Sequence, residues 1–170
     1  ALETSIIVLK NINDWKIETN PHASRFLDVR RKKLFPYFKK QIGFLLNESK
    51  PKLAESFFKK YKILFWDYDL VDLSNKIIKG LYISFNKGVN EILNNDYPLK
   101  AELFFRSEND TRFDNSKVKK LKKKIIKVGR KKCNRLKRGS RKKSFYGLFL
   151  KNYCDHFSGV QRSVSSINNQ

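Results

Sequence analysis

The chain of 170 residues combines a formal net charge of +22, from 38 Lys and Arg against 16 Asp and Glu, with a hydrophobic content of 40%. Such a charge excess attracts polyanions and is rare in a free soluble enzyme, whereas the apolar content, including 14 Phe, excludes a chain that is disordered throughout. No stretch is apolar enough to predict a transmembrane helix, and the first residues lack the features of a signal or transit peptide.

The first predicted helix is basic. Residues 1–23 form an amino-terminal extension that contains a short apolar run, read as a strand or a buried arm. Within residues 24–48, apolar side chains recur at helical spacing and predict a helix over 24–46, with basic side chains between them. Pro36 falls inside this helix and is expected to kink or split it.

An inserted helical segment and loop, residues 49–116, comes next. Apolar stripes predict helices over 50–66 and 70–93, and the polar run 106–116 reads as a loop. Residues 50–97 are less basic than the rest of the chain. Because apolar stripes gain free energy when they are buried, this part is expected to pack mainly on protein.

Most of the positive charge lies in the last segment, residues 117–170. Residues 117–151 hold 17 Lys or Arg and no acidic residue, which is over three-quarters of the net charge. A short basic helix is expected up to Gly129, then a coil over 130–144 that is disordered when unbound, then a short helix from Phe145 and an extended tail. The expected fold is therefore mainly α, a small and extended helical protein with a basic coil, a short carboxy-terminal helix and little or no sheet.

Nothing in the sequence indicates a catalytic site, so an enzyme is not expected. No internal repeat, Gly-rich phosphate loop or pair of catalytic carboxylates is evident, and no cofactor is predicted. Cys133 and Cys154 do not indicate a disulfide framework and lack the spacing of a zinc site, which favours a reducing compartment. Both tryptophans, Trp15 and Trp66, are expected in the core.

The acid-free basic segment predicts nucleic-acid binding. Lys and Arg neutralise phosphates and release counterions, and Arg adds planar donors that match phosphate oxygens. A basic coil can follow the irregular path of folded RNA, whereas a rigid helix suits a regular DNA groove. The candidate RNA-binding residues are Arg30, Arg31, Lys32, Lys33, Arg130, Lys131, Lys132, Arg135, Lys137, Arg138, Arg141, Lys142, Lys143, Lys151 and Arg162.

Short motifs in this segment resemble a known family. The run Arg130-Lys131-Lys132-Cys133, then Arg138, then the pair Phe145-Tyr146, resembles the bacterial-type small-subunit ribosomal protein fourteen family. The run from Asp28 to Leu34, followed by Tyr37, resembles the family's amino-terminal helix. Lys137 replaces an expected Gly, and the cysteine of the motif resembles the branch of the family that lacks zinc.

The resemblance implies a structural, rRNA-binding protein of the small ribosomal subunit head, beside neighbouring head proteins, with no membrane and no small-molecule substrate. Together with a composition typical of AT-rich codons, it suggests a mitochondrial ribosome of a protist, with the protein possibly encoded in the organelle. Two alternatives remain open. One is a polynucleotide-processing or DNA-packaging protein of an AT-rich virus or parasite; the other is a protein bound to anionic membrane surfaces. For the location, the alternative is a ribonucleoprotein of another organelle or of the cytoplasm.

Overall fold

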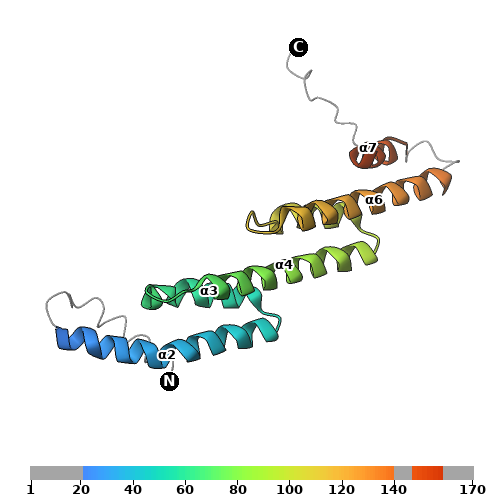
Figure 1. The fold of residues 1–170 in the computed structure, drawn as a ribbon. Coiled ribbons are helices and arrows are strands. Elements are labelled where there is room, and N and C mark those ends of the chain that lie inside the picture. Colours follow the sequence, from blue (N-terminus) through green and yellow to red (C-terminus); the bar gives the residue numbers. More distant parts are fainter. Residues whose placement is uncertain (1–20, 140–146, 159–170) are drawn as a thin grey trace, which may run out of the picture. The chain divides into compact units, whose positions relative to one another are not determined.

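The structure of the chain, a computed structural model, describes residues 21–139 and 147–158. Within these ranges the chain is mainly helical and has no β-strand, as the sequence predicts (Figure 1). The arm or strand expected in residues 1–22 falls almost entirely outside these ranges, as does the tail expected after Ser158. The helices are α2 (Pro21–Asn47), α3 (Pro51–Tyr61), α4 (Val71–Asn94), α5 (Pro98–Glu108), α6 (Asn115–Gly139) and α7 (Gly147–Ser158), with a 3-10 turn, η2 (Lys62–Phe65), after α3.

The chain divides into two compact units, Ala1–Ser84 and Phe85–Gln170. The division lies within α4, which is one continuous helix, whereas the sequence placed boundaries at residues 24, 49 and 117. We call them the first and second unit. Each unit has its own aromatic core.

The core of the first unit is built around Phe38 of α2, which is only 1% exposed. Its ring lies 4.8 Å from the ring of Phe65 and 6.1 Å from that of Phe58, so that α2, α3 and η2 share one cluster. Pro36 does not split α2, which remains one helix from Pro21 to Asn47. The helices expected over 24–46 and 50–66 are therefore confirmed, the latter ending in a 3-10 turn.

The core of the second unit is built around Phe85, near the middle of α4. Its ring lies 5.5 Å from Phe105 of α5 and 5.4 Å from Phe113, which follows α5. Sequence reasoning predicted α4 but missed α5. The apolar residues of α5 do not form a single stripe, because Leu99 and Leu103 are exposed while Phe105 is buried.

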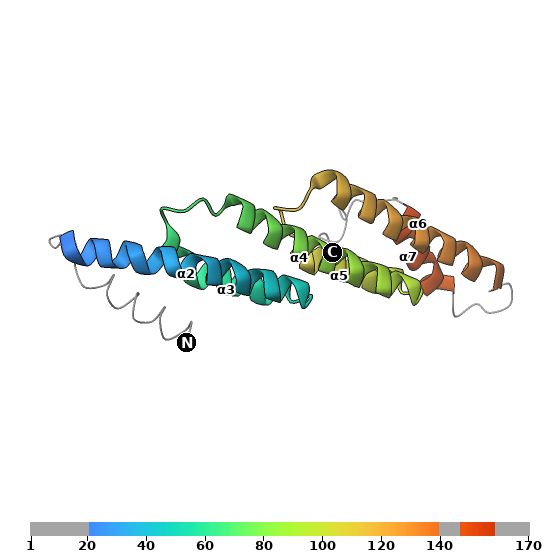
Figure 2. The same ribbon diagram turned by 60° about the horizontal axis from the view of Figure 1, so that its bottom comes forward.

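The two cores belong to an internal repeat, and the expectation that the chain has none is wrong. Residues 51–58 read PKLAESFF and residues 98–105 read PLKAELFF, 47 residues further along. Each copy of the motif forms the start of a short helix that follows a long helix. Figure 2 shows this for α3 after α2 and for α5 after α4. Helix pairs of about this length are the units of helical-repeat proteins.

The turns that join the paired helices also repeat. Ser49 and Asp96, at equivalent positions, both adopt left-handed backbone angles, with φ of 56° and 60°. The N–H of Ser49 bonds to the carbonyl of Leu46, and the N–H of Asp96 to that of Leu93, both at 3.0 Å. Each turn satisfies carbonyls at the end of the long helix, and a Pro then starts the short one.

Trp66 departs from the expected core position. Its side chain is 71% exposed at the end of η2, so the prediction that it is buried is wrong. Trp15 lies outside the described residues. The nearby aromatic residue Phe65 fills the core position instead, against Phe38.

Candidate nucleic-acid interface

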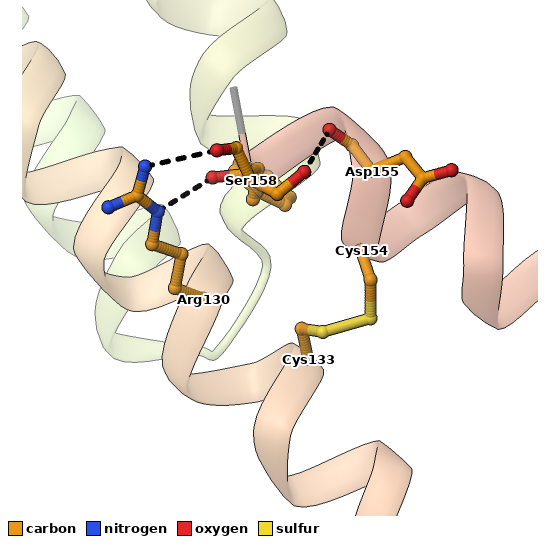
Figure 3. Close-up of a disulfide and its surroundings, with 6 residues drawn as sticks. Arg130, Cys133, Cys154, Asp155 and Ser158 are labelled. Carbon is orange, nitrogen blue, oxygen red and sulfur yellow. Dashed lines mark hydrogen bonds between the residues drawn. A yellow bond between two sulfur atoms is a disulfide. The ribbon is translucent and has the colours of Figure 1, made fainter. Parts of the chain in front are cut away.

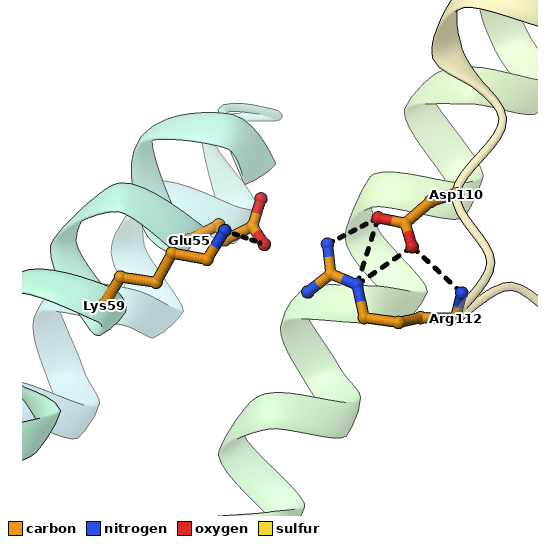
Figure 4. A network of polar contacts seen from close by, with 4 residues as sticks. All are labelled: Glu55, Lys59, Asp110 and Arg112. Carbon is orange, nitrogen blue, oxygen red and sulfur yellow. Dashed lines mark hydrogen bonds and ion pairs between the residues drawn. The ribbon is translucent and has the colours of Figure 1, made fainter.

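The basic helix α6 begins at a loop whose side chains fix its first turn. Arg112 folds back on Asp110, with guanidinium and carboxylate 2.5 Å apart (Figure 4). The Oδ1 atom of Asp114 accepts hydrogen bonds from the backbone N–H of Ser116 at 2.8 Å and of Lys117 at 3.2 Å. The Ser116 hydroxyl and these N–H groups hold the pKa of Asp114 below its ordinary value. Asp114 thus caps α6 at the positive end of its dipole.

The buried face of α6 continues through small residues, which makes the helix longer than predicted. Leu121, Ile125, Gly129 and Cys133 recur every four residues, and all four are buried. A side chain at Gly129 would overlap the ring of Phe157 in α7, so this glycine marks a close approach of two helices.

Two expectations about this region are therefore wrong. Gly129 does not end the helix, and the coil expected over residues 130–144 is helical as far as Gly139. The physical reason is burial: α7 covers Gly129 and Cys133, so the segment has an apolar face that a count of large side chains misses. Residues 140–144 lie outside the described part of the chain.

A disulfide fastens α7 to α6. Cys133 and Cys154 are bonded, with their Cα atoms 5.4 Å apart (Figure 3). The expectation that the cysteines stay unpaired is wrong, because they face each other only once both helices have formed. Within residues 21–139 and 147–158, no three His, Cys, Asp or Glu side chains come together as metal ligands.

Arg130, a predicted RNA contact, instead holds the end of α7. Its Nε atom donates to the carbonyl of Phe157 at 2.8 Å, and its guanidinium also reaches the carbonyl of Ser158 at 3.4 Å (Figure 3). Both carbonyls belong to the last turn of α7, where helical partners are lacking. The side chain of Arg130 remains exposed, but its Nε and Nη2 atoms already have acceptors within the protein.

Two more predicted contacts are engaged by the turn between α4 and α5. The carboxylate of Asp96 lies 2.8 Å from the guanidinium of Arg135 and 3.4 Å from the ammonium of Lys132. Lys132 also lies over the ring of Tyr97, 5.6 Å from its centre. Burial, with a smaller contribution from Asp96, raises the pKa of Tyr153 to about 12. Lys132 and Arg135 therefore help to hold α6 in the second unit.

An acidic residue of α5 meets α7 in the same unit. His156 contacts the carboxylate of Glu102, and Arg106 donates to the same carboxylate at 2.5 Å. Burial alone would raise the pKa of Glu102, but the hydrogen bonds from His156 and Arg106 outweigh it and leave the pKa below its ordinary value. Asp96, in the turn between α4 and α5, thus supplies an acidic partner to α6, and Glu102 of α5 supplies one to α7.

The side of α6 that faces away from the buried stripe is almost entirely basic. At 100° per residue, the residues on this side lie roughly opposite Leu121, Ile125, Gly129 and Cys133, and each of them is exposed. Asn134 is the uncharged member among them. We call this the outward face of α6: Lys119, Lys120, Lys123, Lys127, Lys131 and Arg138.

Of the predicted residues, Lys131 and Arg138 lie on the outward face, whereas Lys137 is exposed but continues the row of Leu121, Ile125, Gly129 and Cys133. Sequence reasoning placed the charge in this segment but did not select the lysines between 117 and 128. The signal was available: Lys120, Lys123 and Lys127 follow helical spacing on the side opposite Leu121 and Ile125. These three lysines lie within the helix that was expected up to Gly129, so their common side could be read from the sequence.

The other predicted contacts are dispersed. In α2, Arg30, Lys32 and Lys33 are exposed, whereas the Arg31 side chain is only 15% exposed and pairs with Asp28. Lys151 is exposed on α7. The remaining predicted contacts lie outside the described residues: Arg141, Lys142, Lys143 and Arg162.

Comparisons with protein-family models, curated protein sequences and solved structures found no match to this chain. None of the helices in the described ranges is both long enough and apolar enough to cross a membrane.

Proposed function

We propose that the chain is a structural component of a ribonucleoprotein and binds RNA through the outward face of α6, with no catalytic role. The single observation that carries the proposal is this face: an exposed row of Lys and Arg on one helix, with no acidic residue from residue 117 to 151. A solvated helix face normally mixes both signs of charge. A face of one sign is instead suited to a polyanion.

The geometry of the face matches a phosphate backbone. From Lys120 to Arg138 the row extends about 27 Å along the helix axis, at a rise of about 1.5 Å per residue. The cap at Asp114, the disulfide and the Asp96 ion pairs hold the helix in place. A row fixed before binding loses less conformational entropy when phosphates order along it.

A narrower proposal rests on the family resemblance. It assigns the chain to the small ribosomal subunit, in contact with its rRNA and with neighbouring head proteins, in a mitochondrial ribosome. The motif residues Arg130 and Lys132 are engaged within the second unit, and Cys133 is in a disulfide. Lys131 and Arg138 are the motif positions that support the rRNA contact best.

A second candidate is DNA binding, which the continuous, capped helix favours. The major groove of B-DNA admits an α-helix, whereas the major groove of A-form RNA is too narrow for side chains to read. A helix that reads DNA bases usually presents Asn, Gln or Arg to them. The outward face is dominated by Lys, with Asn134 and Arg138 as exceptions, which favours phosphate contacts without base readout.

The test compares two variants of equal net charge by fluorescence anisotropy. The outward-face variant carries Lys120→Gln, Lys123→Gln, Lys127→Gln and Lys131→Gln, and Gln preserves helix propensity. The control variant carries the same change at four exposed lysines of the first unit: Lys40, Lys62, Lys76 and Lys79.

Affinity for a structured RNA hairpin should fall by about a hundredfold or more in the outward-face variant at low salt and far less in the control. Equal losses in both variants would show that only the net charge matters and would refute the assignment to α6. A DNA duplex of the same sequence that binds more tightly than the RNA would support the second candidate instead.

A further inference from the structure

The exposed Trp66 has no counterpart in the second copy of the repeat. The residue 47 positions later is Phe113, which is 8% exposed and packs on Phe85. In the first unit, Phe65 already makes the equivalent core contact with Phe38. The first unit thus carries an additional aromatic ring, which its core does not use.

The Trp66 ring is held in place from one side. The guanidinium of Arg31 lies 5.8 Å from the ring centre, which is a cation–π distance. Arg31 is itself fixed by the carboxylates of Asp28 at 2.5 Å and Asp67 at 3.4 Å. A large ring that is already positioned loses little entropy on contact with a partner, which is how Trp acts as an anchor in protein interfaces.

The surroundings of Trp66 are apolar and acidic. Ile63 and Val71 are both exposed, and Ile63 lies three residues before Trp66, on the same side of the 3-10 turn. Residues 63–75 form the longest stretch of the sequence without Lys or Arg. This stretch contains three exposed carboxylates, Asp67, Asp69 and Asp72. We call these six residues, Ile63, Trp66, Asp67, Asp69, Val71 and Asp72, the tryptophan patch.

We infer that the tryptophan patch docks a basic amphipathic segment of another protein. Apolar side chains of that segment would cover Trp66 and Ile63, and its Lys or Arg side chains would meet the carboxylates. Charge complementarity decides the class of partner. Three exposed carboxylates within six residues of Trp66 in the sequence repel phosphates, so a nucleobase stacked on Trp66 would bring its backbone into an unfavourable potential. This inference does not depend on what α6 binds.

The test reads the emission of Trp66 directly. In a full-length Trp15→Phe chain, Trp66 is the only tryptophan. The probe is a synthetic amphipathic helical peptide of Leu, Lys and Ala; a matched peptide has Glu in place of Lys. The Lys peptide should shift the Trp66 emission to the blue with saturation, as burial removes water from the ring, and the Glu peptide should not.

A charge variant isolates the patch. Asp67→Asn, Asp69→Asn and Asp72→Asn together keep the shapes of the side chains and should weaken binding of the Lys peptide by about tenfold or more. The matched control, Glu48→Gln, Glu91→Gln and Asp155→Asn, removes the same charge elsewhere and should leave binding unchanged. If the triple variant loses helicity by circular dichroism, the single variant Asp72→Asn replaces it. This variant keeps the ion pair between Arg31 and Asp67 and the hydrogen bond from the Val71 N–H to Asp69, and it should also weaken binding of the Lys peptide.

Three results would overturn the inference. The first is no saturable shift with the Lys peptide, and the second is an equal shift with the Glu peptide. The third is quenching of Trp66 by a single-stranded RNA while the Lys peptide leaves its emission unchanged, which would make Trp66 a base-stacking residue.

Discussion

The two copies of the helical hairpin, Phe38–Tyr61 and Phe85–Glu108, share their construction and differ in what surrounds them. Both use a left-handed residue in the turn, a Pro to start the short helix, a buried Ala and a buried Phe. In the first copy, Glu55 pairs with Lys59 of its own helix (Figure 4), whereas in the second, Glu102 also meets His156 of α7. The shared residues specify the hairpin. The differing surroundings, basic α6 in one unit and the tryptophan patch in the other, determine its contacts.

The largest expected effect comes from the equivalent core residues. Phe38→Ala and Phe85→Ala should each destabilise the protein by about 3–5 kcal/mol, because each removes a buried ring from its own aromatic cluster. If the units have separate cores, hydrogen exchange should rise mainly in the unit that carries the substitution. A uniform rise throughout both units in either variant would show that the two hairpins unfold as one.

The disulfide distinguishes the second unit from the first. Its cysteines are 21 residues apart, and loss of a cross-link of this size lowers stability by about 3 kcal/mol. Cys154→Ser, or reduction with dithiothreitol, should lower the urea midpoint and expose α7 to hydrogen exchange, with little effect on α2 and α3. Mass spectrometry of alkylated protein purified from its source checks the bond itself. Free thiols at both cysteines would contradict it.

Substitutions of the equivalent turn residues, Ser49 and Asp96, should change stability less, and they should differ from each other. Ser49→Gly relieves the left-handed backbone at little other cost and should stabilise the protein by up to about 1 kcal/mol. Asp96→Gly brings the same relief but removes the carboxylate that pairs with Lys132 and Arg135, so it should give no net gain. Chemical denaturation of both variants measures the difference. Equal stabilisation would mean that the Asp96 ion pairs contribute nothing.

Large apolar residues at helical spacing predicted α2, α3 and α4 correctly, but sequence reasoning failed where small residues pack. Gly129 and Cys133 are buried contacts of α7, so α6 extends through a segment that has few large apolar side chains. The disulfide could not be predicted for the same reason, because Cys133 and Cys154 face each other only when α6 continues past Gly129 and α7 packs on it. The exposed position of Trp66 could not be predicted, because the adjacent Phe65 competes for the same core site and either ring satisfies the pattern.

The location of the positive charge in the chain was predictable, but which of its Lys and Arg side chains bind within the protein and which face outward was not. Arg130, Lys132 and Arg135 read as equal to Lys131 and Arg138 in the sequence, yet the first three hold α6 and α7 within the second unit. Their partners, Asp96 and the carbonyls of α7, come from other helices. Only the three-dimensional arrangement separates structural cations from those that face outward.

The salt dependence of RNA binding tests the central claim most directly. The logarithm of affinity should fall linearly with the logarithm of salt concentration, with a slope of roughly −0.7 to −0.9 for each phosphate neutralised. In the outward-face variant, the loss of four lysines should reduce the size of the slope by about 3, and in the control variant the slope should match that of the unmodified chain. An unchanged slope in the outward-face variant would contradict the account, since the phosphates would then be bound elsewhere.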